Sequence, residues 1–274
     1  VAQINLLVGS VLASYLADGS VSWLYYADRL MEMPLGVFGI AIATVILPSL
    51  SRKHASQSTE AFSAMLDWGV RMIMLIGAPA SLALIILASP LLVTLFQYGA
   101  FSPNDVAQSA LALQAYSLGL LAFMLIKVLA PGYYARQDTK TPVKIGVWSM
   151  VANMALSLVL ITPLTHTGLA LATSAAALLN AGMLYHGLRK VGVYRPGKGW
   201  LVFFLRLSSA SLAMSGVLVW LGRDLAVWLD WGWQMRVLWL LLLVVAGIAT
   251  YVITLFACGL RVRHLRSRAG PDVD

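Results

Sequence analysis

Long apolar runs alternate with short polar segments along the whole chain. A helix needs about 20 apolar residues to cross about 30 Å of hydrocarbon, and eight stretches come close to this length or exceed it. In chain order they are Ala2–Ala17, Val21–Leu50, Gly69–Phe96, Val106–Ala130, Val143–Leu164, Gly168–Leu188, Trp200–Leu221 and Met235–Leu260. Transmembrane strands would give alternating segments of about ten residues instead. The pattern therefore predicts an all-α, polytopic transmembrane helix bundle with eight spans.

The connections between these spans alternate in charge. Every second connection is rich in Lys and Arg, whereas the others hold only Arg223 and Arg236. Because cytoplasmic loops of membrane proteins carry an excess of basic residues, both chain ends and the basic connections are predicted to be cytoplasmic. The basic set consists of Arg52, Lys53, Arg136, Lys140, Lys144, Arg189, Lys190, Arg195, Lys198, Arg261, Arg263, Arg266 and Arg268.

Composition agrees with a membrane protein. Of the 274 residues, 60% are hydrophobic and 11% are charged, whereas a soluble domain averages about 45–50% and about 25%. The single cysteine, Cys258, excludes a disulfide framework. The net charge of +8 fits basic loops, and no basic patch with interleaved aromatic residues indicates nucleic-acid binding. Because the chain starts directly in apolar sequence at Val1, we expect a preceding part of a longer protein to be missing.

Two connections carry more than a turn. Apolar residues at helical spacing after Thr59 predict an interfacial helix near residues 56–67, with Ser58 or Thr59 as its N-cap. Between the last two spans, three tryptophans are placed as an aromatic belt would be, and we interpret them as membrane anchors: Trp228, Trp231 and Trp233.

Ionisable residues inside a span are costly and are therefore candidate sites. The richest cluster lies in the second span, where Arg29 is spaced to meet acidic neighbours on the same helix. Two interpretations remain open: the acids neutralise Arg29 in an internal ion pair, or Arg29 faces a water-filled cavity and binds a phosphate with its planar guanidinium. The candidate substrate-binding residues are Tyr25, Tyr26, Asp28, Arg29, Glu32 and, in the fourth span, Lys127, which could instead extend to the cytoplasmic interface.

Other polar residues inside spans offer a weaker site. Asn153 and Ser157 share a helix face, and Asn5 and Thr173 lie in neighbouring spans. Hydrogen bonds between helices would account for all four, and a cation site is the alternative, although a poor one without a carboxylate. The four histidines have no partner at metal-ligand spacing, and no phosphate loop, dinucleotide fingerprint or nucleophile elbow is present. The sequence therefore predicts no metal, no cofactor and no catalysis.

Several segments along the chain form motifs. The first is WLYYADRLMEMPLGVFG at Trp23–Gly39, followed by LPSLS at Leu47–Ser51. The others are FQYGAF at Phe96–Phe101 and YYARQDTKTP at Tyr133–Pro142. In this order and spacing, they resemble the MurJ (MviN) family of bacterial lipid II flippases, in the multidrug/oligosaccharidyl-lipid/polysaccharide exporter superfamily. Separate motifs in register are more specific than any one of them alone.

Members of that family have two six-helix lobes and two further C-terminal helices. The resemblance implies that residues 1–192 are the C-lobe, that residues 193–274 are the further pair with a basic cytoplasmic tail, and that the N-terminal lobe is missing. It also implies that Arg29 lines a central cavity and holds the lipid II pyrophosphate, while Trp200–Leu221 and Met235–Leu260 form a groove for the lipid tail. Some relatives bind sodium through acids, which the matching region of this chain lacks.

The implied function is translocation of lipid II from the inner to the outer face of the bacterial cytoplasmic (inner) membrane by alternating access, for cell wall synthesis. Lipid II, membrane lipids and the missing lobe would be the partners of a transporter that is not an enzyme. Alternatives are an exporter of another polyprenyl-linked saccharide or of drugs, for which carboxylates would be expected, and a membrane-embedded polyprenyl-phosphate transferase, which would need acidic or histidine clusters. A structural scaffold would leave Asp28, Arg29 and Glu32 without a role.

Overall fold

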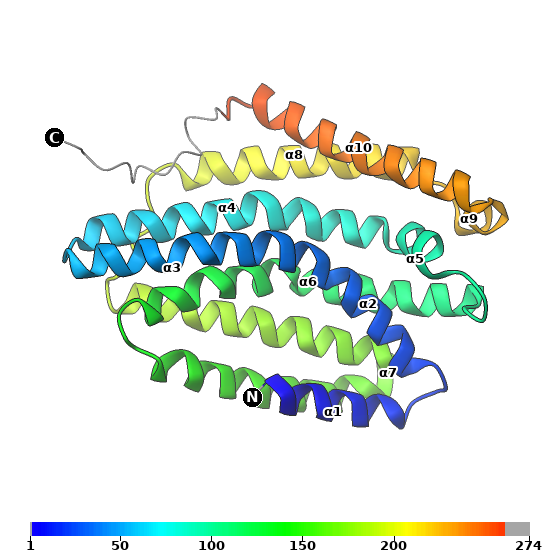
Figure 1. The fold of residues 1–274 in the computed structure, drawn as a ribbon, viewed down its shortest axis with the longest axis horizontal. Coiled ribbons are helices and arrows are strands. Elements are labelled where there is room, and N and C mark those ends of the chain that lie inside the picture. Colours follow the sequence, from blue (N-terminus) through cyan, green and yellow to red (C-terminus); the bar gives the residue numbers. More distant parts are fainter. Residues whose placement is uncertain (1, 261–274) are drawn as a thin grey trace.

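The computed structural model describes residues 2–260, without the side chains of residues 2–6 and 8. This part of the chain is a helix bundle without strands, as predicted (Figure 1). Its helices are α1 (Ala2–Ser14), α2 (Ser20–Pro34), the π-helical η1 (Leu35–Gly39), α3 (Ile40–Ala55), α4 (Thr59–Ile86), α5 (Ala88–Phe96), α6 (Pro103–Tyr134), α7 (Lys140–Lys190), α8 (Trp200–Leu221), α9 (Leu225–Asp230) and α10 (Trp233–Ala257). The basic tail beyond residue 260 lies outside the described residues.

Helices α2, η1 and α3 form one path of 36 residues, Ser20–Ala55. The π-helical turn begins directly after Pro34. Proline has no backbone N–H and its ring crowds the preceding turn, so an α-helix cannot pass it with regular hydrogen bonds. Widening to a π-helix is one way to continue the helix past such a residue. The predicted second span is therefore one continuous element with a local irregularity.

Helix α7 folds back on itself. It contains 51 residues, but Thr165 has φ 50° and ψ −130°, which no helix permits. The side chains of Asn153 and Thr173 are hydrogen-bonded across 20 residues of sequence, so the two arms lie side by side, as Figure 1 shows in green. The arms correspond to the predicted spans Val143–Leu164 and Gly168–Leu188.

Six elements are long and apolar enough to cross a membrane in the described chain. The prediction of eight spans counted the arms of α7 separately and included α1, which has 13 residues, fewer than the about 20 that a span needs. The number eight therefore stays a prediction.

The segment near residues 56–67 does not form a helix of its own. Ser58 caps α4, its side chain accepting from the backbone N–H of Ala61, and the helix continues without a break to Ile86. Phe62, Met65 and Leu66 are buried in the protein core. The amphipathic pattern was therefore real, but its apolar side packs against protein, and the expected separate interfacial helix is the first part of α4.

Helix α6 lies at the centre and packs against α2, α3, α4, α5 and α7. Small residues allow close approach: a Cβ added to Gly119 of α6 would lie 2.7 Å from the backbone of Ser174 in α7. Helices α8 and α10 pair with each other along one side of the bundle, opposite α1 (Figure 1). They join the remaining helices through α4–α8 and α5–α10 contacts.

The three tryptophans predicted as membrane anchors differ in burial. Trp228 is fully buried, so its interpretation as a membrane anchor is wrong. Trp231 is half-buried with its ring stacked on Trp239, and Trp233, which is 61% exposed, remains available as an anchor. The short helix α9 turns Trp228 into the protein core, which composition alone could not reveal.

Candidate functional site

The Arg29 cluster lies on an exposed face of α2. Ala27, Leu30 and Met31 point into the bundle, whereas the side chains of Arg29 and Glu32 are 56% and 49% exposed and form an ion pair of 2.9 Å. The spacing of three residues places both on the same face.

One turn earlier, Tyr25 lies beneath the same guanidinium. Arg29 Cζ lies 5.0 Å from the Tyr25 ring centroid, and this tyrosine is 54% exposed. Such a cation–π contact orients the guanidinium. Arg29, Glu32 and Tyr25 therefore form one accessible polar group on α2.

Two other residues predicted for this site, Tyr26 and Asp28, are less exposed than Arg29 and Glu32. Tyr26 packs against Phe96 and Phe101, with ring centroids 4.7 Å and 5.1 Å apart, and Asp28 is half-buried. The segments Trp23–Gly39 and Phe96–Phe101 are thus in contact. Near the start of α2, Trp23 Nε1 donates to Asp105, the residue that completes the capping box of α6.

Lys127 is not part of the Arg29 cluster. It is exposed on α6 and lies next to η1, since a Cβ added to Gly39 would come within 3.7 Å of its Cγ. Gly39 follows Arg29 by ten residues, which corresponds to about 15 Å of helix. A role for Lys127 in substrate binding stays a prediction.

The weak cation candidates are joined in a hydrogen-bonded chain between the arms of α7. Ser157 donates to Asn153 Oδ1 at 3.2 Å, Asn153 Nδ2 donates to Thr173 Oγ1 at 3.2 Å, and Thr173 donates to the Leu169 carbonyl at 2.9 Å. These bonds link the arms, and within residues 2–260 no group of three acidic, histidine or cysteine residues could hold a metal. The side chain of Asn5 lies outside the described residues.

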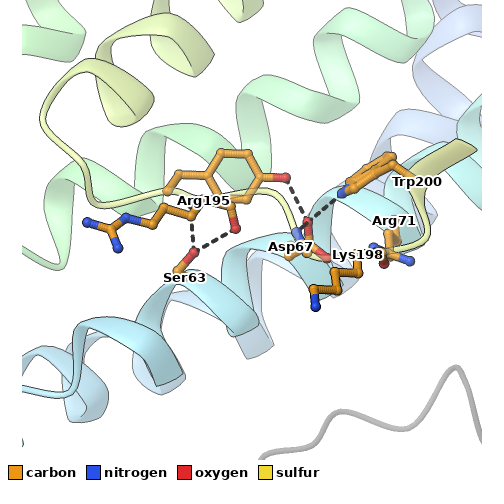
Figure 2. Close-up of polar contacts among 8 residues, drawn as sticks. Ser63, Asp67, Arg71, Arg195, Lys198 and Trp200 are labelled. Carbon is orange, nitrogen blue, oxygen red and sulfur yellow. Dashed lines mark hydrogen bonds and ion pairs between the residues drawn. The ribbon is translucent and has the colours of Figure 1, made fainter.

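Sequence analysis missed a buried carboxylate on α4. Asp67 is 8% exposed, and its Oδ1 accepts from Tyr194 Oη at 3.0 Å, Trp200 Nε1 at 2.9 Å and Gly197 N at 3.2 Å. Its Oδ2 accepts from Arg71 Nε at 2.8 Å (Figure 2). Burial and the adjacent Asp67 raise the pKa of Tyr194, so this hydroxyl stays a donor.

The Asp67 network fixes the linker 191–199 to α4. Arg71 also donates to the Lys198 carbonyl at 3.1 Å and lies 4.7 Å from the Trp200 ring centroid. One turn before Asp67, Ser63 exchanges hydrogen bonds with the backbone of Arg195, at 2.8 Å and 3.1 Å. The four-residue spacing of Asp67 and Arg71 was the only signal in the sequence.

A buried cation on α10 was also missed. Arg236 is 7% exposed, and its guanidinium donates to the carbonyls of Trp228 and Leu229 at 3.0 Å and of Val93 at 3.4 Å. These carbonyls belong to α9 and α5, near their C-terminal ends, where a cation is favourable. Arg236 therefore ties α10 to α5, although its sequence position indicated an external loop.

The sequence profile of the family described as "Lipid II flippase MurJ" matches residues 1–237. The chain belongs to the MurJ family. It is 51% identical over 267 residues to the probable lipid II flippase MurJ of Vibrio cholerae, covering 97% of this chain and 51% of the relative. It is 42% identical over 274 residues to the lipid II flippase MurJ of Burkholderia cenocepacia, covering 98% and 52%.

A solved structure supports the same assignment. "Lipid II flippase MurJ, inward closed conformation" matches with a TM-score of 0.77 and 26% identity, covering 92% of this chain and 50% of that chain. The predicted family and fold class are thus confirmed. The chain spans about half the length of the MurJ relatives it matches.

Proposed function

We propose that this chain forms the C-terminal part of a flippase that carries lipid II across the bacterial inner membrane, with residues 1–192 as a lobe and residues 193–274 as a further helix pair. The observation that carries the proposal is the exposed Arg29 group on α2, inside the segment that first resembled the MurJ family. Arginine stays charged at any physiological pH and can offer several donors to a pyrophosphate. The names of the MurJ relatives point to lipid II as the substrate.

In this proposal, a second lobe faces α2 and encloses a polar cavity. The headgroup of lipid II cannot cross hydrocarbon unaided, because unpaired polar groups there cost several kcal/mol each. Arg29 replaces water as a fixed donor to the pyrophosphate, and rocking of the lobes exposes the cavity to each side in turn. Glu32 holds the guanidinium at 2.9 Å until the substrate arrives.

Two clusters of contacts support a cytoplasmic location of both chain ends. Lys53 and Arg136 lie together at one end of the bundle, whereas Trp23, Asp105 and His166 meet at the other end. Two of the basic connections thus lie together at one end of the bundle, which agrees with the positive-inside rule for the cytoplasmic side.

The test uses the full-length protein in a bacterium depleted of its own lipid II flippase. Lipid II at the outer face is measured for wild type, Arg29→Ala and Arg29→Lys at equal membrane abundance. Wild type should restore exposure of lipid II, Arg29→Ala should abolish it, and Arg29→Lys should recover only part, because lysine lacks the guanidinium fork. Failure of the wild type would reject lipid II in favour of another polyprenyl-linked saccharide.

Arg189 supplies the matched control. Its guanidinium lies 5.7 Å from the ring of Tyr185, four residues earlier, which repeats the Arg29–Tyr25 arrangement at the end of α7. Arg189→Ala should leave lipid II exposure unchanged. Equal losses in both variants would mean that removal of any exposed arginine disturbs the protein, and the assignment of Arg29 would fall.

A further inference from the structure

A pocket of about 290 Å³ lies at the end of the bundle where three connections meet. Its walls come from the end of α3, the start of α4, the α6–α7 loop and the linker before α8. Gln57 makes the reversal possible: its φ of 54° turns the chain, and Ser58 N donates back to the Lys53 carbonyl at 3.2 Å. The turn places the last residues of α3 beside the N-terminus of α4.

The lining is cationic. Lys53 and Arg136 contribute to its charge, His54 also lines the pocket, and no carboxylate does. Neither Lys53 nor Arg136 forms a side-chain hydrogen bond or an ion pair with any residue of the described chain. Two cations from separate connections therefore share one pocket, and neither is in an ion pair within the described residues.

The nearby acids Glu60 and Asp138 do not line the pocket. Glu60 is exposed. Asp138 accepts from the Thr141 backbone N–H at 3.0 Å. The pKa of Asp138 is lowered chiefly by this hydrogen bond, with Arg136 as a smaller cause. The carboxylate of Asp138 is thus engaged by the start of α7.

The N-terminus of α4 adds donors to the same wall. Ser58 and Thr59 line the pocket, and the Ser58 hydroxyl accepts from Ala61 N at 3.3 Å. The backbone N–H groups of Thr59 and Glu60 find no acceptor among the described residues. Such free N–H groups, at the positive end of a helix of 28 residues, favour an anion.

The base of the pocket is apolar. Phe62 is 3% exposed and its ring centroid lies 6.3 Å from that of His54. A buried ring excludes water from one side, so charges above it are screened less than on an open surface. The volume is slightly below the about 300–1,000 Å³ of sites for drug-sized ligands, which suits a small anionic group.

We propose that this pocket binds a phosphate group, held by Lys53, Arg136 and the N-terminus of α4. A phosphate offers several acceptor oxygens to the two side chains and the free N–H groups at once. Its source is an anionic lipid headgroup or a soluble phosphate. The site is separate from the Arg29 group and does not depend on the proposed transport of lipid II.

The test measures binding to the purified full-length protein in detergent. Phosphatidylglycerol and phosphatidylcholine are titrated in one arm, and inorganic phosphate is titrated against chloride at constant ionic strength in the other. The double variant Lys53→Gln/Arg136→Gln should weaken binding of phosphatidylglycerol, inorganic phosphate or both at least tenfold. Loss confined to phosphatidylglycerol identifies a headgroup, and loss confined to inorganic phosphate identifies a soluble anion.

The double variant Arg52→Gln/Lys140→Gln is the matched control. Both residues are exposed at the same end of the bundle, carry the same total charge and do not line the pocket. It should change binding less than twofold. An equal loss in both double variants would show only diffuse attraction, and absence of wild-type binding to either probe would also overturn the proposal.

Thr59→Glu separates binding from folding. A carboxylate in the first turn of a helix is favourable, so α4 should keep its stability while the pocket receives a negative charge. Binding should fall at least tenfold with an unchanged melting temperature. Unchanged binding in this variant would remove the N-terminus of α4 from the site and overturn the proposal as stated.

Discussion

Two arginine–carboxylate pairs, on α2 and on α4, have nearly the same length and very different surroundings. Arg29 and Glu32 are 2.9 Å apart, and Arg71 and Asp67 are 2.8 Å apart. In the first pair about half of each side chain is exposed, whereas in the second the side chains are 24% and 12% exposed.

The difference lies in the remaining hydrogen bonds. Asp67 accepts four, three of them from the linker 191–199 and the start of α8, whereas Glu32 accepts one from Arg29. An exposed pair contributes about 0–1 kcal/mol to stability, and breaking a buried pair costs about 3–5 kcal/mol. The α4 pair therefore holds the fold together, and the α2 pair remains free to exchange partners.

The largest expected effect is that of Asp67→Ala. Removal of the Asp67 carboxylate leaves Arg71 Nε, Tyr194 Oη and Trp200 Nε1 without their acceptor. The free energy of unfolding should therefore fall by about 3 kcal/mol. Denaturant unfolding of the full-length protein in micelles measures this change. Glu60→Ala, an exposed acid on the same helix, should change it by less than about 0.5 kcal/mol. A loss below about 1 kcal/mol for Asp67→Ala would erase the contrast between the two pairs.

Arg71→Lys should have an intermediate effect. Lysine keeps the charge beside Asp67 but loses the fixed second donor to the Lys198 carbonyl and the planar contact with Trp200. We expect a loss of about 1–2 kcal/mol, the sum of one hydrogen bond and one cation–π contact. Arg195→Lys is the control, because the structure uses the backbone of Arg195. Equal stability of Arg71→Lys and wild type would mean that charge alone matters.

Glu32→Gln should change the stability least among the pair variants, by less than about 0.5 kcal/mol, because both partners are exposed. The same unfolding experiment measures it, beside Arg29→Ala. A loss above about 1 kcal/mol in either variant would show that the α2 pair is structural, which returns Arg29 to the role of an internal ion pair.

The sequence predicted well what depends on local pattern. The long apolar helices, the Ser58 cap and the two arms of α7 follow from hydrophobic runs and capping preferences, whereas the number of eight spans stays a prediction. The Asp67 network could not be predicted, because Tyr194 and Trp200 lie more than 120 residues away along the chain. Helical spacing showed that Asp67 and Arg71 are neighbours, but not that a linker would cover them.

In the candidate site, too, local spacing was predictable from the sequence and tertiary packing was not. Tyr25, Arg29 and Glu32 share a face because their spacing is helical, and the structure places them together. Lys127 lies on another helix, and only tertiary packing fixes its distance from Arg29. Trp228 was predicted wrongly: its residue type and sequence position suit a membrane interface, but α9 places it in the protein core.

The smallest expected effect on stability is that of Asp138→Asn, which removes a hydrogen-bonded carboxylate that is not in an ion pair with any described residue. Its carboxylate lies outside the spans and accepts from the Thr141 backbone N–H, and this bond lowers its pKa. A carboxylate whose folded pKa lies below the unfolded value of about 3.9 stabilises the fold above that pH and loses the contribution as the pH falls through the folded pKa. Asp138→Asn should therefore lower stability slightly at pH 7 and reduce its decline below about pH 4. Melting curves from pH 7 to pH 3 measure this, and a pH profile identical to that of wild type would mean that the hydrogen-bonded carboxylate of Asp138 contributes as little as the exposed pair on α2.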